Sequence, residues 1–301
     1  MGFLLLVILL ALIARAGNEE AFDENEYDET TISAFAEIST EDEFVEEVIM
    51  EASDIEPIDT VKTLNDTAVH FHESKPFDVP TIPTTLQSQI LIRKGYTVSY
   101  NKETKQPNWV AWHLTSAHTD GEWARPSGNA FHEDMEAPSP RASNYDFRGS
   151  GWSRGHMCPA GDNKWDSDAM YETFLLSNIC PQNERLNSGD WNDIEQDCRR
   201  WAKKYGDIYI VCGPIFYQQE HETIGTNKIP VPEAFFKVVL RMNGKPTGIG
   251  FICKNTEGNR KTDFYVNTIA QVERITGFLF FPDLPIELNS QVKENAHLQD
   301  W

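Results

Sequence analysis

The distribution of charge along the chain most strongly limits which part of it can fold. The first 60 of its 301 residues contain 17 acidic side chains and one basic side chain, whereas residues 61–301 carry a net charge of only −5. The like charges of such a segment repel one another, and its composition provides little apolar surface to bury. We therefore expect residues 17–60 to be a disordered acidic segment. The total charge of −21 therefore says little about the folded part, and it does not exclude a polyanionic ligand there.

An apolar run near the start predicts export of the chain. Residues 3–14 are all apolar, but a bilayer-spanning helix needs about 20 such residues. Ala14, Arg15 and Ala16 then form a small-x-small cleavage pattern. We therefore expect a signal peptide over residues 1–16, a secreted or periplasmic location and no membrane segment in the mature protein. Because no Lys or Arg precedes the run, a short uncleaved anchor and a wrongly assigned start codon stay open as alternatives.

The remaining chain divides into a linker, one domain and a tail. Residues 61–88 contain three prolines and have the composition of a linker. Regular patterns of apolar residues begin near Ile90 and continue to about residue 281. We therefore expect a folded domain over residues 89–282 and a C-terminal tail over residues 283–301.

Several segments of this domain have the residue types of β-strands. Residues 90–100 and 109–114 are rich in β-forming side chains, and the turn-like segment 101–107 between them predicts an antiparallel pair. The same pattern predicts further strands at residues 208–211, 235–242, 249–253 and 278–281.

Two helices are expected among these strands. The clearest covers residues 190–205, where apolar residues recur at helical spacing. A second covers residues 266–275 and ends at Gly277. Few helices among strands that are joined by short links favour an α+β fold, with a mainly antiparallel central sheet flanked by helices.

The five cysteines all lie in the expected domain and include no CxxC pair, which argues against a zinc ribbon or a thioredoxin-type motif. They are Cys158, Cys180, Cys198, Cys212 and Cys253. In an exported protein we expect one or two disulfide bonds among them, with the odd thiol unpaired or bridged between chains.

The segment from Ser153 to His156, together with a later asparagine, supplies the groups that phosphodiester hydrolysis requires. A base must deprotonate water, and a histidine, with a reference pKa of about 6.5, suits this role. A hard cation and an arginine should face the charge that develops on the phosphate. We therefore predict His156 as the base, Arg154 as a phosphate ligand and Asn187 as a metal ligand, and we expect activity to rise with pH as His156 loses its proton.

A single neutral ligand suits one kind of cation. Mg²⁺ dehydrates reluctantly and keeps several waters, so the amide oxygen of Asn187 can tether it while the substrate completes its coordination. Glu195 lies on roughly the same side of the following helix and can hold the waters of the ion.

Taken together, these residues resemble the DNA/RNA non-specific endonuclease family, which has the ββα-metal fold. The resemblance rests on residues 152–162, on the upstream segments 108–113 and 144–151, and on a series of later positions in the same order. These positions are Leu175, Ser177, Asn178, Pro181, Gln182, Asn187, Gly189, Trp191 and Glu195. The resemblance covers about 190 residues.

The resemblance implies a role for each candidate residue. His156 resembles the base, Asn187 the one protein ligand of Mg²⁺, and Glu195 the carboxylate behind it; Mn²⁺ can replace Mg²⁺. Arg154 and Arg125 resemble the arginines that bind phosphate. The implied substrates are DNA and RNA, cleaved with little sequence preference, and a homodimer is one option for the assembly. The family motif usually opens with Asp where this chain has Ser153, which puts the geometry of that loop in doubt.

Three alternatives remain open from the sequence. Nuclease-like domains of this fold also occur as non-catalytic modules that bind nucleic acid or serve a structural role, although such modules would be expected to lose the histidine or the asparagine. Trp191 fits the core better than a base-stacking role. The basic residues Arg199, Arg200, Lys203 and Lys204 fit either a phosphate track or a solvated helix face.

Overall fold

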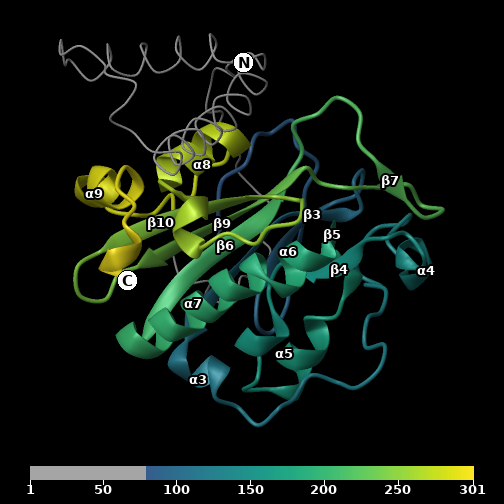
Figure 1. Ribbon diagram of the computed structural model, residues 1–301, viewed down its shortest axis with the longest axis horizontal. Helices are drawn as coiled ribbons and strands as arrows, with labels where there is room; N and C mark the ends of the chain where they lie inside the picture. Colours follow the sequence, from purple (N-terminus) through teal and green to yellow (C-terminus); the bar gives the residue numbers. More distant parts are fainter. Residues whose placement is uncertain (1–78) are drawn as a thin grey trace, which may run out of the picture. The chain divides into compact units, whose positions relative to one another are not determined.

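The computed structural model describes residues 79–301 (Figure 1). The predicted signal peptide, the acidic segment and the part of the linker before Val79 lie outside the described residues. Among residues 79–301, no helix combines the length and the apolar character needed to cross a membrane.

A seven-stranded antiparallel sheet forms the centre of the fold, in the order β1-β2-β3-β6-β9-β10-β11 (Figure 1). The strands are β1 (Gln89–Ile92), β2 (Thr97–Asn101), β3 (Gln106–Thr115), β6 (Asp207–Ile215), β9 (Ala234–Arg241), β10 (Thr247–Lys254) and β11 (Val266–Asn267). Helix α7 (Asp190–Tyr205) packs against β3 and β6, and α8 (Ile269–Thr276) packs against β9 and β10. The predicted α+β fold with a mainly antiparallel sheet is confirmed.

Helix α7 has the bounds that its apolar spacing predicted. Trp191, Ile194 and Cys198 are among its buried side chains and join the main core. The helix ends before Gly206, whose φ of 95° is a backbone conformation that glycine adopts readily. Burial of one face leaves another face of α7 free to present polar side chains.

Two of the sequence predictions differ from the structure near the C-terminal end of the domain. Helix α8 begins three residues later than predicted, because Val266 and Asn267 pair with β10 instead. The strand predicted at residues 278–281 is wrong. Only Leu279 pairs, in an isolated bridge to Thr81, because the Phe280 amide donates to the Glu273 carboxylate and Phe281 has a φ of 50°.

The segment predicted as a tail, residues 283–301, folds back onto the domain. It contains η4 (Ile286–Leu288), α9 (Asn289–Lys293) and η5 (Leu298–Asp300). The ring of Trp301 lies 4.6 Å from that of Trp201 on α7, and both side chains belong to the main core.

The remaining short elements surround the pocket or connect the strands. They are α3 (Ser116–Thr119), α4 (Asn144–Phe147), η1 (Ala160–Asp162), α5 (Ser167–Glu172), η2 (Leu176–Asn178), β7 (Thr223–Ile224), β8 (Ile229–Pro230) and η3 (Thr262–Tyr265).

A separate two-stranded unit holds the predicted motif. Strand β4 (Ser153–His156) pairs antiparallel with β5 (Ile179–Gln182), and the chain continues into α6 (Glu184–Ser188) and α7. Two strands followed by a helix form the ββα arrangement predicted for the site. His156 stands at the end of β4, opposite Ile179.

The predicted disulfide bonds are wrong, because all five cysteines are free and buried. They lie on separate elements whose apolar surroundings keep the thiols protonated. Burial raises the pKa of Cys212 to about 12, and it raises the pKa of Cys198 further.

Candidate active site

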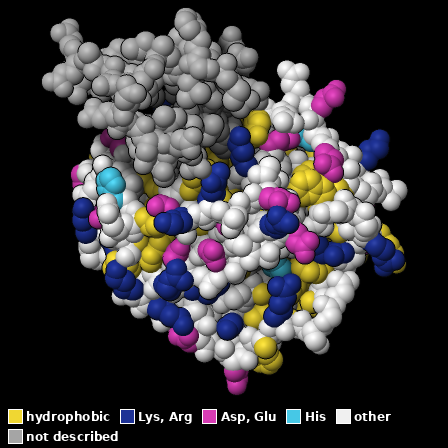
Figure 2. All heavy atoms as spheres, viewed as in Figure 1, with side chains coloured by type: hydrophobic (Ala, Val, Ile, Leu, Met, Phe, Trp, Pro, Cys, Tyr) yellow, Lys and Arg dark blue, Asp and Glu magenta, His cyan; other side chains and the backbone are white. Residues whose placement is uncertain are grey.

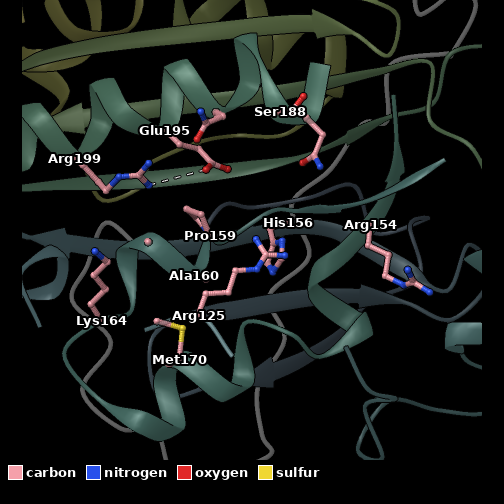
Figure 3. A pocket seen from close by; sticks show the side chains of 13 residues that line it. Arg125, Arg154, His156, Pro159, Ala160, Lys164, Met170, Ser188, Glu195 and Arg199 are labelled. Atoms are coloured by element: carbon pink, nitrogen blue, oxygen red, sulfur yellow. Dashed lines mark ion pairs between the residues drawn. The ribbon is translucent and has the colours of Figure 1, made fainter. Parts of the chain in front are cut away.

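The side chains predicted as functional line a single pocket of about 480 Å³ (Figure 3). They are Arg125, Arg154, His156, Asn187 and Glu195. Arg125 comes from the loop before α4, and the others come from β4, α6 and α7. The fold therefore brings together segments that are distant in sequence, in a pocket large enough for a nucleotide-sized ligand.

His156 is buried among aromatic rings. Its ring centroid lies 5.3 Å from that of Phe131 and 5.1 Å from that of Phe174, which it meets at a right angle. The side chain forms no hydrogen bond through Nε2 within the described residues. Burial, together with the positive charge of Arg125, lowers the pKa of His156 to about 3. The imidazole is therefore neutral over the physiological range and has the lone pair that a base needs.

Two contacts hold β4 in position. A side chain at Gly155 would overlap Gln182 on β5, so only glycine allows the two strands to approach this closely. Beyond it, the indole Nε1 of Trp191 donates a hydrogen bond to the main-chain carbonyl of His156. Trp191 is 1% exposed, so it is a core residue that joins α7 to β4 and does not stack on a base.

Asn187 lies in the last turn of α6. Asn183 caps this helix by accepting hydrogen bonds from the amides of Arg185 and Leu186. The side-chain amide of Asn187 faces the pocket and forms no hydrogen bond within residues 79–301. Its oxygen is therefore available to a ligand.

Glu195 projects from α7 into the same pocket, where its side chain is 12% exposed. Burial raises the pKa of this carboxyl to about 7, and the positive charges of Lys237 and Arg199 oppose the rise. The nearest oxygen of Glu195 lies 4.0 Å from Nη1 of Arg199. The same Nη1 is 2.9 Å from the buried Asp162, which also accepts from Trp112. This network fixes Arg199 at the pocket wall.

A buried lysine lies beneath the site. Lys237 on β9 is 1% exposed, and its ammonium sits 4.3 Å from the ring centroid of Trp191 and 5.2 Å from that of Trp112. Its charge favours the ionised form of Glu195. No sequence pattern points to Lys237, a charged residue inside the mostly apolar strand β9.

The two predicted phosphate ligands differ in their surroundings. Arg154 donates to the Asn144 carbonyl over 3.1 Å and lies over the rings of Phe131 and Phe147, at the end of the pocket away from Glu195 (Figure 3). Burial lowers the pKa of Arg154, and the positive charge of Arg148 lowers it further. Arg125 is exposed, and Figure 3 shows its side chain reaching toward His156.

Sequence reasoning missed Lys164 and Asn192, which also line the pocket, and left Arg199 undecided. Lys164 lies in a loop and belongs to no recognisable motif. Arg199 belongs to the pocket, whereas Lys204 does not, because its ammonium donates to the Trp301 carbonyl over 2.7 Å. Spacing along a helix alone could not separate these two cations.

The pocket contains oxygen donors that suit a hard divalent cation. Among residues 79–301 there is no cluster of three or more His, Cys, Asp or Glu that could hold a metal. However, the unpartnered amide of Asn187 and the carboxylate of Glu195 face the same space, and Mg²⁺ accepts such oxygens while it keeps several waters. These residues fit the ion that the sequence implied.

The family of the chain follows from comparison with known proteins. Residues 73–287 match the DNA/RNA non-specific endonuclease family. The chain belongs to this family. Its enzymes are metal-dependent nucleases, and the resemblance drawn from residues 152–195 is therefore confirmed.

Similar proteins include nucleases from animals and fungi. The chain is 38% identical over 206 residues to the mitochondrial nuclease EXOG of Xenopus laevis, covering 63% of this chain and 57% of that protein. It is 30% identical over 210 residues to mitochondrial endonuclease G of Homo sapiens, covering 65% and 71%. It is 34% identical over 213 residues to nuclease C1 of Cunninghamella echinulata var. echinulata, covering 65% and 84%. The chain thus spans less than two thirds of the EXOG relative.

A solved structure of the EndoG/EndoGI complex has the same fold. It matches with a TM-score of 0.62 at 28% sequence identity, covering 66% of this chain and 87% of that one. The ββα-metal fold that the sequence predicted is confirmed by this match.

The predicted secreted or periplasmic location is wrong. The EXOG and endonuclease G relatives are mitochondrial nucleases by name. The prediction rested on a short apolar run, which lies outside the described residues and lacks the basic residues that precede the core of an export signal.

Proposed function

We propose that the domain hydrolyses phosphodiester bonds in DNA and RNA with little sequence preference, with His156 as the general base. One observation supports this above all: a neutral histidine, an unpartnered amide, a carboxylate and several cations line one pocket in a member of a nuclease family.

The environment of His156 keeps it in the form that can accept a proton from water, although a pKa this low makes it a weaker base than an ordinary histidine. The imidazole is neutral over the physiological range, and the rings of Phe131 and Phe174 restrict its movement. An imidazole with a fixed position and a free lone pair can accept a proton as water attacks phosphorus. Trp191 fixes the position of the backbone from which this base projects.

Asn187 would hold Mg²⁺ through its amide oxygen, and Mn²⁺ could take its place. When bound, such an ion supplies positive charge that stabilises the phosphate as its negative charge increases. Glu195, on the next helix, adds a negative charge close to this position once it is ionised. A neutral ligand at Asn187 leaves more of the positive charge of the ion to act on the substrate.

The cations around the pocket would position the substrate through its phosphates. Arg154 lies at one end, Lys164 and Arg199 lie at the other, and Arg125 lies near His156 (Figure 3). Contacts with phosphates contain no information about base identity. Substrate binding by these side chains therefore explains a nuclease with little sequence preference and with activity on both DNA and RNA.

A non-catalytic nuclease-like module is the alternative. Such a module has no need of a base or of a metal ligand, whereas His156 and Asn187 are both present and face one pocket. The enzymatic function therefore agrees better with the geometry.

Cleavage assays on plasmid DNA and on RNA, with Mg²⁺ and with EDTA, test the proposal. We expect nicking of the plasmid and degradation of RNA with the ion, and neither with the chelator. A folded protein that binds DNA but cleaves neither substrate with Mg²⁺ or Mn²⁺ would support the non-catalytic alternative.

A further inference from the structure

A second groove continues from the active-site pocket. It is lined by Lys164, Arg199, Arg200 and Lys203, together with Gly161, Thr119 and Gln196, and we call it the basic groove. Gly161, Lys164 and Arg199 line both the pocket and the basic groove, so the two depressions are continuous. Figure 2 shows Lys and Arg side chains gathered over the lower part of this face of the molecule, where α7 lies in Figure 1.

The walls of the basic groove come from different elements. One wall is a face of α7, because Lys203 follows Arg200 by three positions and Arg199 by four, and both spacings place side chains next to each other on a helix. The other wall is the loop around Lys164 together with Thr119 of α3. A groove between two such walls can hold an extended strand.

Every charged side chain that lines the basic groove is positive. Three of these cations have carboxylate partners nearby. Arg199 pairs with Asp162, Arg200 pairs with Asp197, and the ammonium of Lys203 lies 2.6 Å from Asp120.

These pairs leave positive charge available to a ligand. Lys203 and Asp120 are about half exposed, and an ion pair of that kind contributes little free energy, so a phosphate can compete for the lysine. Lys164 forms no ion pair within the part of the chain that the structure describes. Water-exposed cations along a groove are the usual features of a site that follows a nucleic-acid backbone.

The order of the side chains along the pocket gives a path. In Figure 3, Arg154 lies at one end, His156 lies between, and Lys164 and Arg199 lie at the other end. The basic groove begins where Lys164 and Arg199 stand. A strand whose scissile phosphate lies at His156 and that extends past Arg199 would next meet Arg200 and Lys203.

We propose that the basic groove binds phosphates of the substrate strand beyond the scissile bond, on one side only, so that the enzyme favours polynucleotides over dinucleotides. This inference rests on the proposed nuclease function. The proposal assigns different roles to the four neighbouring cations of α7. Those that face the substrate are Arg199, Arg200 and Lys203, whereas Lys204 does not face it.

Two adjacent lysines provide a matched pair of variants for the test. Lys203→Gln and Lys204→Gln each remove one exposed positive charge from the same helical turn, but only Lys203 lines the basic groove. We expect Lys203→Gln to raise KM several-fold for a long oligonucleotide at low salt and to leave cleavage of a dinucleotide unchanged. Lys204→Gln should change neither. Adding Arg200→Gln to Lys203→Gln should raise KM further.

Binding without cleavage separates this inference from the proposed function. In a His156→Ala background, fluorescence anisotropy with a labelled oligonucleotide measures affinity at several salt concentrations. We expect Lys203→Gln to lose about one phosphate contact. On duplex DNA, that loss makes the slope of log K against log salt shallower by about 0.9. Equal affinities and equal slopes for the Lys203 and Lys204 variants would contradict phosphate binding by the basic groove, and the proposed nuclease function would be unaffected.

Discussion

The indole Nε1 of Trp191 donates a hydrogen bond to the main-chain carbonyl of His156 over 3.3 Å. This bond joins the end of β4 to the first turn of α7, the helix that also presents Glu195. A core residue therefore sets the distance between the proposed base and the carboxylate beside the proposed cation site. Small shifts of such groups have large effects on rate, because catalysis depends on position.

Trp191→Phe should reduce kcat more than it changes KM. The phenyl ring keeps most of the core packing but cannot donate the hydrogen bond, so β4 and α7 are no longer joined at this point. We also expect a loss of about 2 kcal/mol in the free energy of unfolding, measured in urea. Trp201→Phe is the control, because Trp201 is also a core residue of α7 but packs against Trp301, away from the pocket. An equal fall in kcat for both variants would contradict this role of Trp191.

Asn187→Ala should abolish Mg²⁺-supported cleavage and weaken metal binding, whereas Glu195→Gln should weaken metal binding less. The reason is that Asn187 would contact the ion, and Glu195 would act through the waters around it. Calorimetric titration with Mg²⁺ or Mn²⁺ measures both affinities. Unchanged metal affinity in Asn187→Ala would place the ligand elsewhere.

Activity should rise with pH near neutrality because of Glu195 and not because of His156. The pKa of His156 is lowered to about 3, so this base is already neutral above pH 5, contrary to the expectation from an ordinary histidine. The pKa of Glu195 is raised to about 7, and its negative charge appears as the pH rises through that value. The pH dependence of kcat/KM reports groups of the free enzyme. Glu195→Gln should flatten the profile between pH 6 and 8; an unchanged rise would assign it to another group.

The same carboxyl should lower stability at high pH. Its folded-state pKa of about 7 exceeds its ordinary value of 4.5, so folding opposes ionisation. Below pH 4.5 the carboxyl is protonated in both the folded and the unfolded state, so it does not affect the free energy of unfolding. As the pH rises from 4.5 through 7, ionisation increasingly favours the unfolded state and the free energy of unfolding falls. At pH 8, Glu195→Gln should therefore increase the free energy of unfolding by about 3 kcal/mol relative to the native chain. The difference should vanish near pH 4 in urea titrations, and a difference independent of pH would exclude this cause.

Much of the architecture could be predicted from local pattern. The bounds of α7 followed from apolar spacing and from the glycine after Tyr205, because both act within one helix. The pairing of β2 with β3 followed from two β-rich segments around a short turn, but the first segment, predicted as continuous over residues 90–100, forms two strands, β1 and β2, that pair with each other. The strand predicted at residues 278–281 is absent because the Glu273 carboxylate, on the preceding helix α8, accepts a hydrogen bond from the Phe280 amide that a strand would have used.

The candidate site divides in the same way. His156 and Asn187 belong to a recognisable motif, so the sequence could point to them. Lys164 and Lys237 could not be found in this way, because each reaches the site from an element whose position depends on the whole fold. The pKa of His156 was also beyond the sequence, since it depends on burial and on the charge of Arg125.

Plasmid cleavage by His156→Ala tests the central claim most directly. The variant removes the proposed base from the pocket wall and leaves α7 and the sheet unchanged. We predict that it folds, binds DNA like the native chain, and cleaves supercoiled plasmid in Mg²⁺ about 10² to 10⁴ times more slowly. Cleavage at the native rate by a folded His156→Ala protein would contradict the assignment of His156 as the base.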